Sequence, residues 1–365
     1  MKSIIKYFNE ALIKKATKIS SYKYFPKTKE ELRSLIEQLL DERGPDADLN
    51  DIDTSDITDM SNLFKNLNPH NIDISEWNLS KVKDIHYMFY NCKKFNSDLS
   101  KWDVSNVENM DCIFMGCYKF NSDLSNWDVS KVKNMNLMFF VCKNFNSDLS
   151  RWDVSNVETM HSMFIRCFKF NSDLSGWDVS KVTDMYSMFD ECKKFTGQGL
   201  ENWNVSNVTT MHSIFSQCPN FNCDLSKWNV SNVEDMWGMF NRCEKFNSDL
   251  SNWNVSKVKD MSAMFRFCEK FNSDLSGWNV SNVENMRGMF YDCKSFNSDL
   301  SGWDVSKVTS IYEMFYGCEK FDSDLSDWNI SNVQYIKNMF DGCTSLKNKP
   351  SWYDPDSSRF KKYII

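Results

Sequence analysis

The chain has 365 residues and a formal net charge of −7, from 43 basic and 50 acidic side chains. This acidic balance argues against a nucleic-acid-binding protein, which would carry a basic stripe. No apolar run approaches the ~18 residues needed to cross a bilayer, so we expect no transmembrane segment. With only 4 His and 11 Gly, the sequence offers little for a metal centre or a glycine-rich phosphate loop, and we expect no metal and no cofactor. What needs explaining is the excess of 20 Met, 28 Phe, 13 Trp and 13 Cys.

Residues 1–25 are predicted to form a basic amphipathic segment. Residues 1–29 contain eight Lys and one Glu, and several apolar side chains can share a helix face. Such a helix could make weak contact with an anionic membrane through residues 1–20 or fold back onto the acidic remainder, and we favour packing or disorder over membrane contact. The segment lacks the apolar core of a secretory signal, because Lys6, Glu10 and Lys14 interrupt it.

Residues 26–51 are predicted to contain an N-terminal capping helix. Thr28 and Glu31 have the spacing of a capping box, in which each side chain accepts from a free N–H at the start of a helix. Leu32, Ile36 and Leu39 then recur on one helical face. Gly44-Pro45 is a strong stop signal, so we expect the helix to end there.

A 25-residue repeat occupies residues 52–346. Eleven tryptophans follow one another from Trp77 to Trp328 at intervals of 25, except for one interval of 26 between Trp177 and Trp203. Counting back from Trp77 adds a degenerate first turn that begins at Ile52, so the repeat has twelve turns. We expect residues 347–365 to form a C-terminal cap or tail. A fixed period of this length predicts a solenoid, in which each unit buries its apolar face against its neighbours.

With Trp as position 1, the turn has the sequence W-[DN]-V-S-[NK]-V-x-x-M-x-x-M-F-x-x-C-x-x-F-N-S-D-L-S-x. Positions 9 and 12 hold 18 of the 20 Met, position 13 is Phe in all twelve turns, and position 16 holds 11 of the 13 Cys. The unusual composition is therefore one set of residues copied along the chain. Because the cysteines come once per turn with no C-x-x-C pair, we expect buried thiols rather than zinc ligands or disulfides.

Each turn is predicted to contain one helix and one strand. The apolar positions 6, 9, 12, 13 and 16 have helical spacing, and Ser at position 4 with Glu at position 7, as in Ser105 and Glu108, has the spacing of a capping box. The segment L-x-x-W-x-V alternates as a short strand does. We therefore predict an α/β, leucine-rich-repeat-like solenoid of about twelve 25-residue strand–helix turns, with a parallel sheet on one side and helices on the other.

These motifs resemble those of BspA-like leucine-rich-repeat surface proteins, over residues 26–353. L-x-x-W-x-V is similar to the L-x-x-L-x-L core of leucine-rich repeats, and F-x-x-C-x-x-F is similar to the F-x-x-C-x-x-L signature of the BspA-like group. The resemblance implies a bacterial protein at the cell surface or secreted, which adheres to host or matrix proteins. The Asn of ordinary leucine-rich repeats is Val here, so Ser at position 4 or Asn at position 20 (Asn96, Asn121, Asn146) is expected to satisfy the backbone instead.

Candidate binding residues are those that vary between turns on faces expected to be exposed. On the helix side, eight apolar residues of four adjacent turns form a candidate protein-binding patch: Tyr90, Met115, Tyr118, Leu137, Phe140, Val141, Ile165 and Phe168. An alternative is that they are half-buried between neighbouring helices. Position 25 gives candidate contacts on the strand face: Lys101, Asn126, Arg151, Asn202 and Lys227.

No arrangement of Ser, His, Asp or Cys marks a catalytic site, so we expect no enzyme. The sequence indicates a non-catalytic scaffold for protein–protein interaction. The family resemblance favours a surface adhesion role, whereas the missing secretory signal and the reduced column thiols are compatible with an intracellular scaffold in the cytoplasm.

Overall fold

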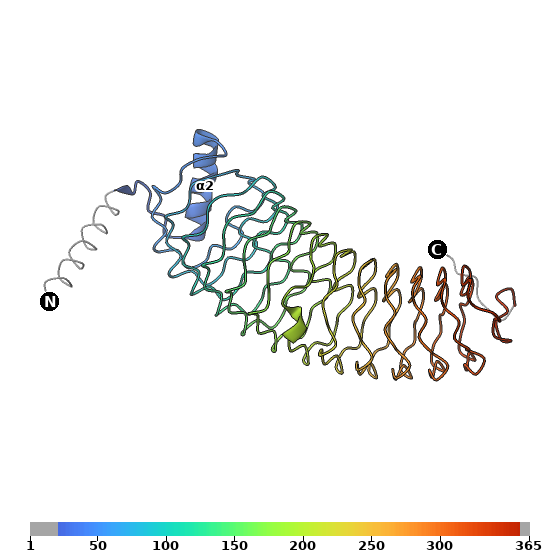
Figure 1. The fold of residues 1–365 in the computed structure, drawn as a ribbon. Coiled ribbons are helices and arrows are strands. Elements are labelled where there is room, and N and C mark those ends of the chain that lie inside the picture. The colour runs from blue at the N-terminus through green and yellow to red at the C-terminus, as the bar shows by residue number, and fades with distance from the viewer. Residues whose placement is uncertain (1–20, 358–365) are drawn as a thin grey trace, which may run out of the picture.

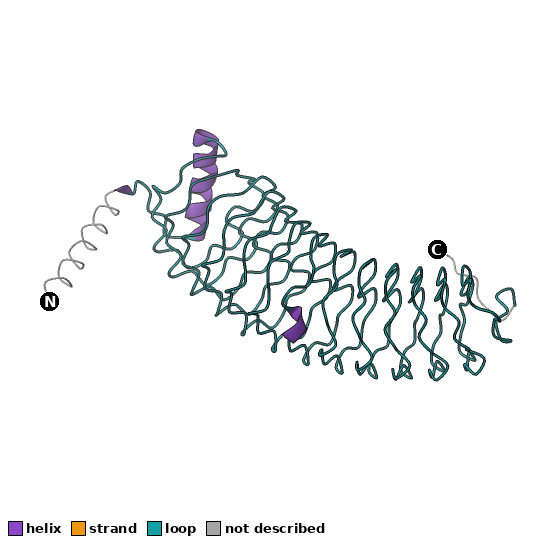
Figure 2. Ribbon diagram, in the orientation of Figure 1, coloured by secondary structure: helices purple, strands orange, loops and turns teal. Residues whose placement is uncertain are grey.

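The structure, a computed structural model, describes residues 21–357. Within this range the only helices are α2 (Lys29–Arg43) and the short 3-10 helix η1 (Leu200–Asn202), and no residue belongs to an extended strand. Figure 2 shows that the rest of the described chain is built of turns and loops. The predicted strand–helix units, with a parallel sheet on one side and helices on the other, are therefore wrong.

The 25-residue period itself is confirmed. Parallel bridges join position 8 of each coil to position 8 of the next, from Asp59 in the first coil to Tyr335 in the twelfth. Most partners are 25 residues apart, and the pair Asp184–Thr210 spans 26 because of the insertion. Figure 1 shows the coils stacked side by side in chain order, with α2 at the N-terminal end. We number the coils from 1, which begins at Ile52, to 12, which begins at Trp328.

The coil backbone cannot be helical, because two residues of every coil are left-handed. Positions 11 and 15 have positive φ in all twelve coils, as at Tyr87 (φ 54) and Asn91 (φ 60). A left-handed residue interrupts the run of equal φ and ψ on which an α-helix depends. The segment that was predicted to be a helix is instead a series of tight turns.

Backbone hydrogen bonds alternate between the coil and its neighbour. The N–H groups of positions 12, 14 and 16 donate three residues back within the coil, as Met88 N does to Ile85 O (3.2 Å). The N–H groups of positions 9, 11, 13 and 15 donate to the next coil, as Phe89 N does to Ile113 O (2.9 Å). Each coil thus depends on its successor for about half of the bonds that a helix would make internally.

Aromatic columns fill the core along the whole array. The Phe side chains of position 13 stack from coil to coil, with ring centroids 5.5 Å apart for Phe139 and Phe164. Phe170 of position 19 packs on Phe164 at 4.1 Å. The Trp column is equally regular, with Trp152 and Trp177 6.4 Å apart and parallel to within 1°. These columns, with Val, Met, Leu and Cys, are almost fully buried, which confirms the expected core.

Polar side chains satisfy backbone groups of the neighbouring coil. Trp127 Nε1 donates to Leu99 O at 3.0 Å. Asn96 Oδ1 accepts from Asn121 N at 2.7 Å, and the same bond recurs along position 20, which confirms the predicted role of that asparagine. These two side-chain bonds recur from coil to coil and satisfy one backbone group each time.

The predicted capping boxes within the repeat are wrong, since no helix starts at position 4. Ser105 N and Ser105 Oγ both bond Asp103 Oδ1, at 3.1 and 2.6 Å. The serine thus closes a local turn with the acidic residue two positions before it. Position 7 instead carries opposite charges in neighbouring coils, which pair at Lys83–Glu108 (3.3 Å) and Lys259–Glu234 (2.7 Å).

At the N-terminal end, α2 covers the first coil. Thr28 Oγ1 accepts from Glu31 N at 3.1 Å and Gly44 ends the helix with φ 85, so the predicted start and stop are confirmed. Arg33 Nη1 donates to Leu63 O (2.8 Å) and Lys65 O (3.3 Å). These carbonyls occupy positions 12 and 14, which accept from the preceding coil elsewhere, so Arg33 replaces the coil that is missing there.

At the other end, Trp352 lies on Trp328 with centroids 6.4 Å apart and extends the Trp column by one ring. Trp352 Nε1 donates to Leu325 O at 2.8 Å, as the repeat tryptophans do. Residues up to 357 thus include a partial C-terminal cap. The basic segment predicted over residues 1–25 lies largely outside the described residues, as does the end of the C-terminal tail.

The single-residue insertion is accommodated by glycine. Gly199 has φ 92, and a Cβ there would lie 2.2 Å from Ser175 N. The chain then makes η1 and rejoins the register, so Trp203 still stacks on Trp177 at 6.2 Å.

Candidate functional site

The residues of position 25 lie on one exposed edge of the array. The five predicted from the sequence, Lys101, Asn126, Arg151, Asn202 and Lys227, are all exposed. Lys101 Nζ reaches Glu76 Oε1 of the preceding coil at 3.4 Å. This edge is polar and mixed in charge.

The variable residues of positions 10, 11, 14, 15 and 17 lie on the tight-turn segment of each coil, and we call this surface the turn face. All eight members of the predicted apolar patch belong to it, and all eight are half-buried. The structure therefore places them together on coils 2–5, partly covered by neighbouring coils rather than by helices. None is as exposed as Trp237 further along the same face.

Two patch residues occupy left-handed positions that suit glycine. Leu137 has φ 54 and Val141 has φ 61, whereas coil 3 has Gly116 at the position of Val141. A β-branched residue in this region is costly, typically by about 1–3 kcal/mol. An apolar side chain is therefore kept on this surface at the expense of local backbone strain.

Lysines border the aromatic members of the patch. Lys143 Nζ lies 4.6 Å from the ring centroid of Tyr118, and Lys65 Nζ lies 5.3 Å from that of Tyr90. The patch is thus an apolar centre with a cationic rim.

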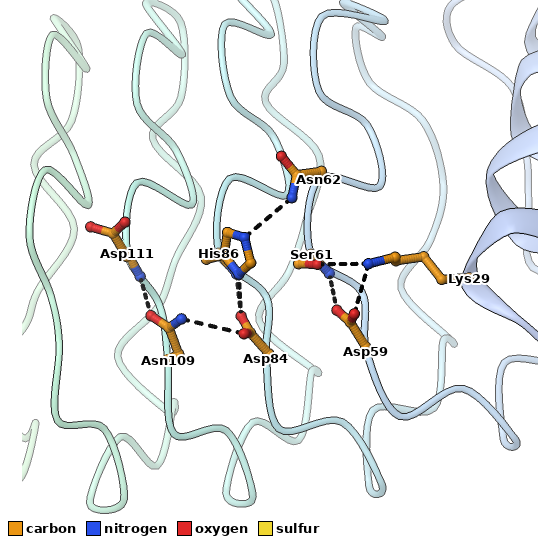
Figure 3. A network of polar contacts seen from close by, with 8 residues as sticks. All are labelled: Lys29, Asp59, Ser61, Asn62, Asp84, His86, Asn109 and Asp111. Carbon is orange, nitrogen blue, oxygen red and sulfur yellow. Dashed lines mark hydrogen bonds and ion pairs between the residues drawn. The ribbon is translucent and has the colours of Figure 1, made fainter.

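Polar side chains of positions 8 and 10 form a network across α2 and the first coils (Figure 3). Lys29 Nζ donates to Asp59 Oδ2 at 2.7 Å. His86 lies between Asp84, 2.7 Å from its Nδ1, and Asn62, 3.2 Å from its Nε2. Asp84 continues the network to Asn109 at 3.3 Å.

The other column histidines are paired in a similar way. His161 Nδ1 lies 3.3 Å from Asp184 Oδ2, and His212 Nδ1 lies 3.0 Å from Asp235 Oδ2. A carboxylate of the next coil thus orients His161 and His212, whereas the carboxylate beside His86 belongs to the same coil. Among residues 21–357, no three His, Cys, Asp or Glu side chains are grouped so that they could hold a metal ion.

Position 10 also contains a stack of rings that the sequence analysis missed. His161, Tyr186, His212 and Trp237 follow one another in coils 5–8, with successive centroids 4.7, 4.5 and 4.6 Å apart. The signal was four consecutive ring residues in one variable column. Trp237 ends the stack and is 39% exposed.

A cavity of about 320 Å³ opens on the turn face beside Trp237. Residues of four successive coils line it, among them Trp237, Arg242, Ser262, Arg266, Arg287 and Glu313. Its lining carries three guanidinium groups and one carboxylate, in a chain whose net charge is negative. The sequence alone does not reveal this site, because the three arginines occupy three different repeat positions in three coils and form no column.

Among these arginines, Arg266 is positioned both by an aromatic ring and by a carboxylate. Its guanidinium lies 3.8 Å from the ring centroid of Tyr291, and its Nη1 lies 3.9 Å from Glu313 Oε2. Burial lowers the pKa of Arg266, and the charges of Arg287 and Arg242 act in the same direction, against Tyr291 and Glu313. The cavity therefore concentrates positive charge near half-buried aromatic rings.

Asp190 lies between the apolar patch and this cavity, at position 14. Burial raises the pKa of Asp190 to about 6, although Ser216 opposes the shift by hydrogen bonding. Its Oδ1 is buried without a hydrogen-bond partner. A carboxylate at this position thus carries an unfavourable charge near neutral pH.

The column cysteines are buried free thiols, as predicted, except that Cys343 is half-buried. Each donates to the preceding coil, as Cys117 Sγ does to Phe89 O at 3.0 Å. Burial raises the pKa of Cys142, which keeps the thiol protonated and unreactive. The cysteines therefore belong to the core.

None of the helices within residues 21–357 has the length and apolar character needed to span a membrane. No curated protein matches the sequence. A family described as "Mycoplasma protein of unknown function, DUF285" matches four overlapping segments of the chain, residues 34–142, 116–198, 183–299 and 268–361. Together these segments cover residues 34–361, which include most of α2 and every coil, so the chain belongs to this repeat family of unknown function.

Proposed function

We propose that the protein is a non-catalytic scaffold that binds a protein partner through the apolar patch on coils 2–5. The observation that carries this proposal is the gathering of eight half-buried apolar side chains on coils 2–5, among them the β-branched Val141 at φ 61, where the neighbouring coil has glycine. Strain of this kind persists where the side chain serves a purpose, and a half-buried apolar surface with a cationic rim suits protein contact.

The patch also ends within one coil step along position 14. Position 14 is Tyr90, Met115, Phe140 and Ile165 in coils 2–5, and changes to Asp190 in coil 6. The core does not change at this boundary, since Phe164 and Phe189 stack at 5.5 Å like other Phe pairs. A change confined to the surface supports selection for binding rather than for folding.

The test compares two double variants of the full chain. Phe140→Asp with Ile165→Asp should abolish retention of a protein partner in a pull-down, while Arg151→Asp with Lys227→Asp on the position 25 edge should retain it. Both variants should remain folded. The patch variant should melt at a lower temperature, because a carboxylate at half-buried position 14 is unfavourable at Asp190, and the edge variant should melt like the parent because its residues are exposed. Loss of binding in the edge variant alone would move the site to the other face, and an unfolded patch variant would assign these residues to the core.

The family resemblance supports a finer version of the proposal, in which the partner is a host or matrix protein and the scaffold acts at the cell surface as an adhesin. The alternative is an intracellular scaffold, which the buried, protonated thiols favour because they need no oxidising compartment. Protease treatment of intact cells separates the two. A surface protein is cleaved while the cells are intact, and an intracellular one is cleaved only after lysis.

A further inference from the structure

We propose that the cavity between Trp237 and Arg287 binds a flat aromatic or heteroaromatic ring that carries a phosphate or sulfate group. This ligand site is separate from the apolar patch and goes beyond the protein-binding function proposed above. Two features define the site: a missing ring in the position 10 stack and the arginines beside it.

The stack stops at Trp237 although the column continues. In coil 9 the column residue is Ser262, whose small side chain is buried and donates to Asp260. Among residues 21–357, no ring stacks on the face of Trp237 opposite His212, and Trp237 borders the cavity. In coil 10 the column residue is Arg287, which lies across the cavity from Trp237.

The gap matches the thickness of one ring. Each step of the stack measures 4.5–4.7 Å, so Trp237 and Arg287 are separated by two coil steps, or about 9 Å. One ring at the centre would lie about 4.5 Å from each, which is an ordinary stacking distance. Arg287 is itself held over Tyr312, with 5.6 Å from its guanidinium carbon to the ring centroid. A bound ring would thus complete a continuous stack from His161 to Tyr312.

The arginines define the charge of the ligand. Arg242 lies over Phe267 at 4.3 Å and Arg266 lies over Tyr291 at 3.8 Å, so aromatic rings cover one face of each guanidinium. Stacking of this kind leaves the N–H groups in the guanidinium plane able to bind the oxygens of an anion. Gly288 makes room for Arg266, because a Cβ there would lie 3.2 Å from its Nη1. Several guanidinium groups around one position favour a phosphate or sulfate over a single carboxylate.

The experiment is isothermal titration of the full chain with two probes. Adenosine 5′-monophosphate represents a free nucleotide, and N-acetyl-phosphotyrosine amide represents a modified tyrosine of a protein. Inorganic phosphate, adenosine and N-acetyltyrosine amide separate the contributions of charge and ring. We expect one of the two probes to bind at least tenfold more tightly than inorganic phosphate and than the same compound without its phosphate. The probe that binds more tightly identifies the ligand as a free nucleotide or as a modified tyrosine of a protein. Binding of neither probe, or equal binding of inorganic phosphate, would overturn the proposal.

A variant that fills the gap tests the geometry without removing a charge. Ser262→Tyr places in coil 9 a residue that coils 6 and 11 already have in this column, at Tyr186 and Tyr312, and should weaken ligand binding at least tenfold. Lys337→Tyr is the matched control, since it adds the same ring to the same column in coil 12 and should leave binding unchanged. If Ser262→Tyr does not fold, Trp237→Ala removes an exposed indole and should cause the same loss. A folded Ser262→Tyr or Trp237→Ala variant that binds like the parent contradicts the proposed stack.

Discussion

Two segments of this chain have the same sequence signals for a helix, and only one of them is helical. Thr28 and Glu31 precede an apolar stripe in α2, and Ser105 and Glu108 precede one in coil 3. The first segment forms a 15-residue helix, whereas the second makes tight turns with left-handed residues at Cys112 and Gly116. The difference lies in what each segment has beside it.

Among residues 21–357, α2 packs with one face against the N-terminal end of the array and satisfies its backbone internally. A segment within the array has a copy of itself on either side, so alternate N–H groups can donate to the next coil, as Cys112 N does to Asn136 O at 2.9 Å. The internal i to i−3 bonds then reproduce the three-residue spacing that also marks a helix. Apolar periodicity therefore does not distinguish a helix from a tight-turn coil when the sequence is repeated.

The largest expected effect comes from the core, and it differs between the two segments. Phe164→Ala removes a fully buried ring that contacts both neighbouring coils, and should lower the free energy of unfolding by about 3–5 kcal/mol. Leu39→Ala in α2 should cost about 2 kcal/mol. Hydrogen exchange should show faster exchange across coils 4–6 for the first variant and only near the N-terminal end for the second. Equal and local effects would mean that the coils do not depend on one another.

An intermediate effect is expected at Asp190, because position 14 would point outward on a helix but is half-buried between coils. Its pKa is raised to about 6, so the folded protein binds a proton between about pH 4 and 6 that the unfolded chain has lost. The contribution of Asp190 to stability is therefore complete below pH 4 and is lost as the pH rises through 6, by about 2–3 kcal/mol.

Urea unfolding at pH 4.5 and pH 7.5 measures this effect as the difference between the parent and Asp190→Asn. The variant should be the more stable of the two at pH 7.5, and the advantage should shrink at pH 4.5. An advantage that does not change with pH would assign the effect to packing rather than to charge.

The sequence predicts the core of this molecule better than its backbone. The period, the buried columns and α2 follow from residue choice alone. Apolar residues are buried every 25 residues regardless of the backbone conformation that links them. The backbone of the coils could not be predicted correctly, because the left-handed residues are mostly not glycine and so leave no signal in the sequence. Position 11, for example, is Tyr87, Leu137 or Ser162 in some coils and Gly238 in another. The arginine cavity was missed for a related reason, since Arg242, Arg266 and Arg287 come together only when neighbouring coils are stacked in register.

The smallest expected effect is the change in the free energy of unfolding when a residue is replaced by Gly. Its sign should differ between a helix and a coil of the repeat. Ala263 occupies position 11 with φ 54, between Gly238 and Gly288 in the adjacent coils. In a helix, Ala→Gly costs about 1 kcal/mol. Here the left-handed conformation penalises Ala, so Ala263→Gly should raise the free energy of unfolding by about 0.5 kcal/mol despite the greater freedom of Gly in the unfolded chain. Ser34→Gly at an exposed site of α2 is the matched control and should lower it by about 0.5 kcal/mol. Opposite shifts of the urea midpoint would show that one sequence pattern leads to two backbone conformations. A lower midpoint for both variants would instead indicate that the repeat segment is helical.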